Sequence, residues 1–269
     1  MKLQHRTAVL TGAASGIGRA TAMALARRGC HLALADIDEA GLAQTADAAA
    51  VLGVRVSRHR LDVADRDAVL ALPAAVLAHH GRVELLINNA GVALGGSFEQ
   101  VSEEDFDWLM AINLHGLVRM TRVFLPLLRA ADEARIVNLS SVYGLISPPG
   151  QTAYSASKFA VRGFSNALRH ELAGSSVGVT VVHPGGVATA IARNARVPAG
   201  VSAQEVAARK ALADKMLRGS PDQAAETIVQ AIARKRDRVL VGGDAKFIAL
   251  LERLAPVHYW RLLARLIPS

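Results

Sequence analysis

The 269-residue sequence contains one cysteine and few aromatic side chains. The single cysteine, Cys30, excludes an internal disulfide framework and any zinc site made of cysteines, and it fits a reducing compartment such as the cytoplasm. Aromatic residues make up 4% of the chain, which argues against a nucleic-acid surface built on base stacking. The neighbours His79 and His80 have no suitably spaced acidic or cysteine partner, so we expect a solvated helix end there and no metal site.

Long apolar runs are also missing. No stretch reaches the roughly 18 apolar residues that a membrane-spanning helix needs. The N-terminus faintly resembles a signal peptide, with a lysine, a short apolar run and Ala-Leu-Ala at 24–26. Cleavage there would remove the glycine-rich motif described below, so we expect an uncleaved chain in the cytoplasm.

The positive charge is concentrated near the C-terminus. The formal net charge is +8, from 31 Lys and Arg against 23 Asp and Glu. Eight of these cations and three of these acids lie from Arg234 onward, a net of +5, which leaves +3 for the rest of the chain. Because the body of the chain is nearly balanced, we expect no nucleic-acid partner.

Apolar runs alternate with helical patterns along most of the chain. The predicted strands are residues 7–11, 31–36, 54–61, 84–87, 135–139, 177–183 and 239–241. Helices are predicted at 16–28, 40–52, 65–80, from 102 toward 113, 115–131, 154–173 and 221–234, with Pro73 kinking its helix or marking an irregular start. This alternation predicts an α/β fold, a doubly wound parallel sheet that binds ligands at the carboxyl ends of its strands.

A glycine-rich turn joins the first predicted strand to the first helix. Residues 11–18 read TGAASGIG. Glycines allow a tight turn and close approach of the backbone to a pyrophosphate, and the helix N-terminus offers free N–H groups. Asp36 ends the second strand, where a carboxylate can bind a ribose 2′-hydroxyl and would repel a 2′-phosphate. Arg19 is the one nearby cation, and neither Ser15 nor Ile37 is basic, so NAD is predicted over NADP.

Further motifs follow in order along the chain. They are Leu61-Asp62-Val63, Asn88-Asn89-Ala90-Gly91, Asn113, Ser140-Ser141, Tyr154-Ser-Ala-Ser-Lys158 and Pro184-Gly185-Gly186-Val187-Ala188-Thr189. With this ordered set the sequence resembles the short-chain dehydrogenase/reductase family over residues 7 to about 189. The resemblance implies a Rossmann-type seven-stranded sheet, a nicotinamide cofactor and a homotetramer or dimer. It does not supply the substrate.

Tyr154 and Lys158 lie four residues apart, which places them on one face of the predicted helix. A nearby ammonium favours the phenolate, so we expect Lys158 to lower the pKa of Tyr154 and make it the acid/base. The resemblance implies that Ser141 hydrogen-bonds the substrate oxygen and that Asn113 holds a water of a proton relay. It also implies that Lys158 reaches the ribose hydroxyls of the nicotinamide half.

The resemblance also implies which residues surround the cofactor. Asp62 and Val63 would meet the adenine, and Thr189 would contact the carboxamide or the phosphates. Asn89 would lie under the adenine-side ribose or would mainly brace the central strands. The whole expected contact set is Gly12, Ser15, Gly16, Ile17, Gly18, Asp36, Asp62, Val63, Asn89, Ala90, Gly91, Tyr154, Lys158, Pro184, Gly185, Val187 and Thr189.

Residues 190–219 interrupt the alternation of strands and helices, at the place where the family carries a substrate lid. Leu94, Val142 and Gln151 lie in loops that we expect near the pocket. This mostly apolar lining favours an apolar alcohol or ketone. Arg193 and Arg196, in the lid, leave an acid or an acyl thioester open as substrate.

The last 26 residues form a second departure from the pattern. We divide the chain into a catalytic domain, 1–243, and an amphipathic helical extension, 244–269. Phe247, Ile248, Leu251 and Leu254 are predicted to share one face, and Leu266 and Ile267 add apolar surface after Pro256. The extension is interpreted as an arm on another subunit or a cap on the pocket, in preference to a basic amphipathic segment lying on a membrane.

Together these features predict an NAD-dependent oxidoreductase that interconverts a moderately sized apolar secondary alcohol and its ketone. One alternative is an NADPH-dependent reductase of 3-oxoacyl thioesters or other carbonyls, against which Asp36 argues. An alternative of another class is a nucleotide-sensing binding protein on the same fold. A sensor has no need of Ser141, Tyr154, Lys158 and Asn113 together.

Overall fold

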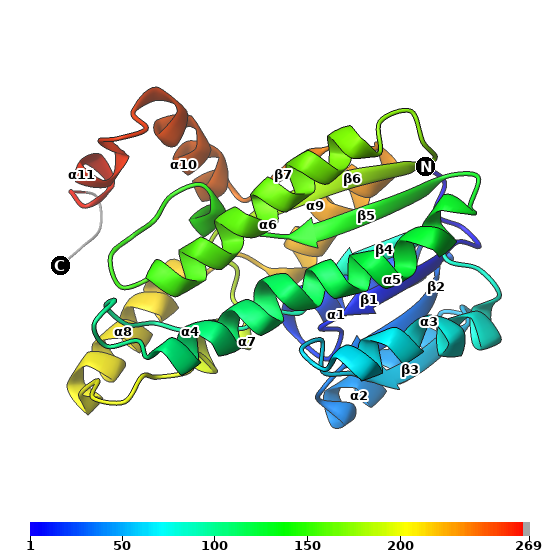
Figure 1. Cartoon of the computed structure of the whole chain (residues 1–269), viewed down its shortest axis with the longest axis horizontal. Helices are drawn as coiled ribbons and strands as arrows, with labels where there is room; N and C mark the ends of the chain where they lie inside the picture. The colour runs from blue at the N-terminus through cyan, green and yellow to red at the C-terminus, as the bar shows by residue number, and fades with distance from the viewer. Residues whose placement is uncertain (266–269) are drawn as a thin grey trace.

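The computed structural model of the protein, which describes residues 1–265, contains one seven-stranded parallel sheet (Figure 1). The strand order is β3-β2-β1-β4-β5-β6-β7. The strands are β1 Thr7–Thr11, β2 His31–Asp36, β3 Val56–Arg60, β4 Leu85–Asn88, β5 Ala134–Leu139, β6 Val177–Pro184 and β7 Arg238–Val241. The order reverses direction between β1 and β4, and at such a point an α/β sheet opens a crevice at its carboxyl edge. The predicted Rossmann-type sheet is confirmed.

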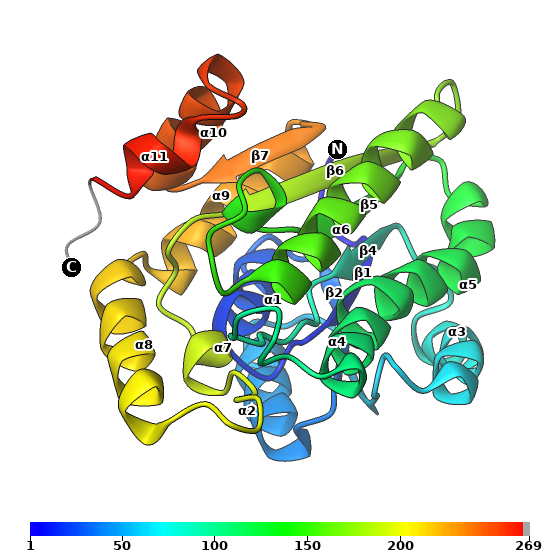
Figure 2. The same cartoon turned by 60° about the vertical axis from the view of Figure 1, so that its left-hand side comes forward.

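Helices cover both faces of the sheet (Figures 1 and 2). On one face lie α1 Gly16–Ala26, α2 Glu39–Ala50 and α9 Pro221–Ala233, and on the other lie α3 Arg66–His80, α5 Leu117–Arg129 and α6 Thr152–Glu171. Strand β1 shows why both faces are apolar. Ala8 and Leu10 join the core under α1 and α9, whereas Val9, which points the other way, joins the core under α3 and α5.

The predicted break near residue 113 is wrong. Helix α4, Glu103–Met110, continues through a π-helical segment η1, Ala111–Gly116, into α5 without interruption. Ser102 begins this rod by accepting a hydrogen bond from the Asp105 amide at 3.1 Å. Periodicity of apolar residues cannot reveal a π turn, because the turn itself shifts that periodicity.

Two expectations around α3 can be compared with the structure. Asp65 caps a helix that begins at Arg66, so the alternative of an irregular start at Pro73 is wrong, and Pro73 lies inside the helix. His80 is buried, and its Nε2 lies 2.9 Å from the Ser57 hydroxyl, so only His79 forms a solvated helix end. The cause is tertiary: β3 packs beside the end of this helix and covers one of the two rings.

After β6 the chain forms α7 Ala190–Arg193 and α8 Ala203–Met216, in the region predicted as the lid. After β7 it forms α10 Gly243–Leu254 and α11 Tyr259–Leu263. Ile248 and Leu251 of α10 are half-buried while Phe247 and Leu254 are exposed, so the four residues predicted to share one face span the boundary between the buried and the exposed sides of the helix. Leu266 and Ile267 lie outside the described residues. Through residue 265, no helix is both long and apolar enough to span a bilayer.

Candidate active site

The glycine turn at the carboxyl end of β1 is packed so closely that side chains would not fit. Gly12 has φ +66° and Gly16 has φ +53°, which are conformations that favour glycine. A Cβ on Gly18 would lie 1.9 Å from the carbonyl oxygen of Gly12, and one on Gly12 would lie 2.7 Å from the Asn89 amide nitrogen. The turn therefore presents backbone alone to any ligand in the crevice.

The first turn of α1 offers its backbone N–H groups to that crevice. Ser15 is the N-cap residue, but its side chain makes no capping hydrogen bond. Ile17 is half-buried at the start of the helix. Uncapped amides and the positive end of the helix dipole suit an anion, so the residues here fit the pyrophosphate of a dinucleotide.

Asp36 connects the end of β2 to the glycine turn. Its Oδ2 accepts from the Ala14 amide at 2.8 Å and its Oδ1 accepts from the Asp38 amide at 3.0 Å. Each carboxylate oxygen has a second lone pair, so Asp36 can still accept a bond from a ribose hydroxyl.

Arg19, the cation nearest this site in the sequence, is committed elsewhere. Its guanidinium donates to the Ala14 carbonyl at 2.6 Å, to the Gly41 carbonyl at 3.2 Å and to the Thr45 hydroxyl at 3.0 Å. It ties α1 and α2 to the glycine turn, a role that sequence reasoning missed. These bonds engage two of its three guanidinium nitrogens, Nε and Nη2.

The loop after β4 lies against the glycine turn. The Asn89 side chain donates to the carbonyls of Thr11, at 3.0 Å, and Gly12, at 2.9 Å, and the Thr11 hydroxyl accepts from the amides of Asn89 and Ala90. Of the two roles expected for Asn89, the structure shows the bracing of the central strands, because its side chain binds the end of β1. Farther out, Val63 is buried against Gly116, and the Asp62 carboxylate accepts from the Ala64 amide at 2.8 Å.

The four predicted catalytic residues converge at the carboxyl ends of β4 and β5. Lys158 is 4% exposed, donates to the Leu139 carbonyl at 3.1 Å and has its Nζ 5.6 Å from the centre of the Tyr154 ring. Ser141 caps the 3-10 turn η2, Val142–Gly144, by accepting from the Tyr143 amide. The structure therefore brings the tyrosine, the lysine and the serine to one place.

Burial dominates the acid–base properties of this pair. It raises the pKa of Tyr154 to about 12, although the Ser141 hydroxyl lowers the value in part. It lowers the pKa of Lys158 to about 8. The pKa of Tyr154 is thus shifted opposite to the expected direction, because burial is the largest effect and the Ser141 hydroxyl opposes it only in part.

Asn113 lies within the π-helical segment η1, and its side chain binds backbone. The amide accepts from the Val92 N–H at 2.8 Å and donates to the Val92 carbonyl at 3.0 Å and the Ser157 hydroxyl at 3.2 Å. A Cβ on Gly91 would lie 3.1 Å from Asn113 Oδ1 and 3.4 Å from Lys158 Nζ. Asn113 thus fixes the loop after β4 beside the lysine, and Gly91 keeps the space next to the ammonium clear.

The loop after β6 closes on the glycine turn from the opposite side. Pro184 ends β6, and Thr189 lies so near the turn that a Cβ on Gly16 would be 3.1 Å from its methyl group. The Gly186 amide donates to Asp244 Oδ2 at 2.6 Å, and a Cβ on Gly185 would collide with the same carboxylate.

A bridge between Val187 and Gly219 ties the far end of the lid segment to this loop. Asp244 belongs to the C-terminal extension, and no local motif marked it.

His183 is a second residue that sequence reasoning missed. It is fully buried at the end of β6, and its Nδ1 lies 2.9 Å from the Ser141 carbonyl oxygen. Because a carbonyl only accepts, Nδ1 carries the proton. Burial lowers the pKa of His183 to about 4, so the ring is neutral at physiological pH. This hydrogen bond holds the backbone of Ser141 against the end of β6.

Of the predicted substrate-side residues, Leu94 lies against both the lid and the tyrosine. It pairs with Arg196 in an isolated bridge and is buried in a cluster with Leu109 and Ala153, against which Tyr154 packs. Val142 is buried next to Ser141 in the sequence, and Gln151 is half-buried and bridges Gly96.

Two lid arginines hold the lid against the loop after β4. Arg196 forms an ion pair with Asp105 at 2.8 Å, with its guanidinium 4.9 Å from the Trp108 ring centre. Arg209 donates to the Gly95 carbonyl at 3.0 Å and to the Gln100 side chain at 3.1 Å. Arg196 is therefore occupied by a carboxylate of the protein and is not held open for an acidic substrate.

The C-terminal extension also reaches the site. The Tyr259 hydroxyl accepts from the Ser147 amide at 3.0 Å, within the segment that joins Ser141 to Tyr154. Together with Asp244, this contact ties the extension to the segment before Tyr154 and to the loop after β6.

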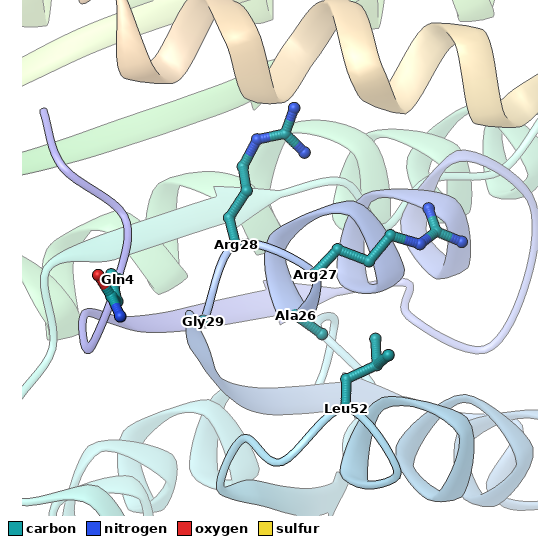
Figure 3. A pocket seen from close by; sticks show the side chains of 6 residues that line it. All are labelled: Gln4, Ala26, Arg27, Arg28, Gly29 and Leu52. Carbon is teal, nitrogen blue, oxygen red and sulfur yellow. The ribbon is translucent and has the colours of Figure 1, made fainter.

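A surface hollow of about 520 Å³ lies elsewhere (Figure 3). Its lining residues are Gln4, Ala26, Arg27, Arg28, Gly29 and Leu52. These residues precede β1, β2 and β3, so the hollow lies at the amino ends of the strands. It is separated from the glycine turn by the length of the sheet and belongs to no part of the site.

Comparison with known proteins agrees with this architecture. The family model of short chain dehydrogenases matches residues 6–199. The Mycobacterium tuberculosis protein SadH, which is named as an oxidoreductase, is 46% identical over 263 residues, covering 97% of this chain and 95% of its own. The 3-oxoacyl-(acyl-carrier-protein) reductase FabG of Thermotoga maritima is 36% identical over 189 residues, covering 70% of this chain and 77% of its own.

Among solved structures, a short-chain dehydrogenase/reductase from Burkholderia phymatum in complex with NAD superposes with a TM-score of 0.88. It is 35% identical to this chain, and the match covers 95% of each chain.

Proposed function

The chain belongs to the short-chain dehydrogenase family of NAD(P)-dependent oxidoreductases, and from that premise we propose that it interconverts an apolar secondary alcohol and its ketone with NAD as cofactor. The observation that carries this proposal is the meeting of Tyr154, Lys158 and Ser141 at the carboxyl edge of the sheet, the edge at which the uncapped start of α1 also lies. Bound nicotinamide would accept or supply the hydride. The residues of this chain bind the substrate oxygen and move the proton.

Tyr154 acts as the acid/base at the substrate oxygen. Its raised pKa keeps the phenol protonated at neutral pH, the form that donates a proton to a ketone oxygen as it becomes an alcohol. In the opposite direction the phenolate must accept that proton, and the Lys158 ammonium stabilises it. The Ser141 hydroxyl shares the substrate oxygen with Tyr154 and fixes its position.

Support for NAD over NADP comes from the second strand. Asp36 holds a carboxylate at the place where a ribose 2′-phosphate would lie, and Arg19 is bound to backbone oxygens. Both features favour a cofactor with a free 2′-hydroxyl. The Burkholderia phymatum relative was solved in complex with NAD, which is consistent with NAD as the cofactor proposed here.

An apolar substrate is supported by what surrounds Tyr154. Leu94 and Val142 are buried there, and Arg196 already has Asp105 as its partner. Reduction of 3-oxoacyl thioesters is the rival within the family, because FabG is a relative. Asp36 argues against that rival, which would use NADPH. A nucleotide-sensing protein, the alternative of another class, has no need of Ser141, Tyr154 and Lys158 together. The homo-oligomeric assembly and the cytoplasmic location remain predictions.

The test begins with titration of the protein with NADH and with NADPH, followed by nicotinamide fluorescence. We expect clear preference for NADH, and then turnover in a screen of apolar secondary alcohols with NAD. Tyr154→Phe should abolish turnover and leave NADH affinity within about twofold, because the ring still fills its place. Near-normal rates in this variant would refute the mechanism, and preference for NADPH would refute the role of Asp36.

A further inference from the structure

Helix α10 exposes a stripe of apolar and cationic side chains to solvent. Lys246, Phe247, Leu250, Arg253 and Leu254 are exposed on it. At about 100° per residue these five positions fall within an arc of roughly 120°. The three apolar side chains are 50%, 56% and 74% exposed, respectively, along one edge of the arc, and the two cations line the other edge. Large apolar side chains clustered in this way cost free energy in water unless something covers them.

The same surface continues into the segment that follows α10. Val257 is 80% exposed and Leu262 is 41% exposed. Arg261 and Arg265 are exposed beside them. Over residues 244–265, the extension therefore combines five exposed apolar side chains with four exposed cations.

The two acidic residues of this segment, Asp244 and Glu252, lie outside the arc that the exposed apolar side chains and cations of α10 occupy. Asp244 accepts from the Gly186 amide, and Glu252 is half-buried. Burial and Arg162 lower the pKa of Arg238, and Glu252 lies close enough to offset part of that effect. The surface charge of residues 244–265 is thus mostly positive, with four exposed cations against the exposed Asp244, whose carboxylate is bound to the Gly186 amide.

We propose that this outward surface of the extension binds the surface of an anionic phospholipid bilayer, lying in the interface without crossing it. Apolar side chains that enter the acyl boundary, flanked by cations at headgroup level, are the combination that such binding requires. A second copy of the chain fits less well. In a symmetric contact through this face, the cations of one copy would meet those of the other and repel them.

The placement of the extension gives the binding a direction. Both views show α10 and α11 at the same end of the molecule as lid helix α8 (Figures 1 and 2). This is the end at which the strands terminate and the catalytic residues lie. Bilayer contact through the extension would bring the substrate side of the site near the membrane. The inference stands on the extension alone and does not depend on the proposed substrate.

The experiment is co-sedimentation of the full chain with vesicles of phosphatidylcholine alone and of an equal mixture with phosphatidylglycerol. We expect binding to the anionic vesicles only. The pair Lys246→Gln and Arg253→Gln should weaken that binding about 25-fold, since each cation near the surface contributes about fivefold. The triple change Phe247→Ser, Leu250→Ser and Leu254→Ser should weaken it at least about tenfold.

Matched controls carry the same kinds of change at exposed positions far from the extension. They are Arg58→Gln with Arg66→Gln, and Val51→Ser with Leu70→Ser. We expect both control pairs to bind like the unchanged protein, and all variants to keep the same circular dichroism spectrum and NADH affinity.

Three results would overturn the proposal. The first is absence of binding to anionic vesicles. The second is equal weakening by Arg58→Gln with Arg66→Gln, which would make the overall charge of the protein responsible. The third is a dimer, seen by light scattering, that the triple serine change dissociates, which would show that a second copy covers the face.

Discussion

Replacing Lys158 with methionine should change how the stability of the cofactor-free protein depends on pH. Burial lowers the pKa of Lys158 from 10.5 to about 8, and this difference corresponds to about 3 kcal/mol. Between those two values the unfolded chain holds the proton and the folded chain does not, so stability rises with pH there. Below pH 8 the folded protein bears the whole cost of the buried charge. Methionine, of similar length and without charge, removes that cost.

The measurement is urea denaturation at about pH 6.5 and about pH 9.5, at one protein concentration. The free energy of unfolding of Lys158→Met, taken relative to that of the unchanged protein, should be about 2 kcal/mol lower at the higher pH than at the lower pH. At the higher pH the cost of keeping the Lys158 charge buried falls to about 1 kcal/mol, so its removal gains less. The Leu139 carbonyl left without its donor costs about 1–3 kcal/mol at both pH values, so it cancels from the comparison. Lys246→Met serves as the control for losing an exposed lysine. An equal stability difference at both pH values would refute the argument.

Gly18→Ala should lower the free energy of unfolding by more than about 3 kcal/mol, because its Cβ would lie 1.9 Å from a backbone oxygen. In the control Gly163→Ala, in α6, the new Cβ would have no atom within 4 Å, and the free energy of unfolding should rise by about 0.5–1 kcal/mol. Urea denaturation measures both variants. His183→Leu should lower kcat on the order of tenfold at unchanged NADH affinity, because it releases the Ser141 backbone; unchanged kcat would contradict this role. Asp244→Leu should weaken NADH binding about fivefold to tenfold by freeing the loop after β6, whereas Asp244→Asn, which keeps an acceptor, should stay within about twofold. Equal NADH affinities for the two variants would show that the contact between Asp244 and the Gly186 amide does not support cofactor binding.

The fold was largely predictable because apolar strands and helical spacing are local signals. Strands β1 and β2 match the predicted ranges residue for residue. The π-helical segment escaped prediction because it shifts the very spacing that reveals a helix. His80 was misplaced because its burial depends on Ser57, which lies 23 residues earlier on β3, beyond the reach of helical spacing.

The candidate site divides in the same way. The linear motifs located Tyr154 and Lys158, and the structure brings them together. His183 and Asp244, which hold the loops around them, come from segments whose sequence has no local pattern for that task. The direction of the pKa change at Tyr154 was missed because desolvation depends on everything packed around a side chain, and spacing along a helix does not report it.

The π-helical segment η1 determines where the long rod α4–η1–α5 tolerates insertion and deletion. A π turn joins residues five apart where an α-helix joins residues four apart, so η1 winds in one extra residue. Deleting one residue between Ala111 and Gly116 would remove the extra residue and leave a regular α-helix, so α4 and α5 would keep about the same orientation. Leu109 would stay in its buried place against Leu94, whereas Asn113, within the lost π turn, would turn from Val92. The extra residue therefore serves the placement of Asn113 and not the packing at the two ends of the rod.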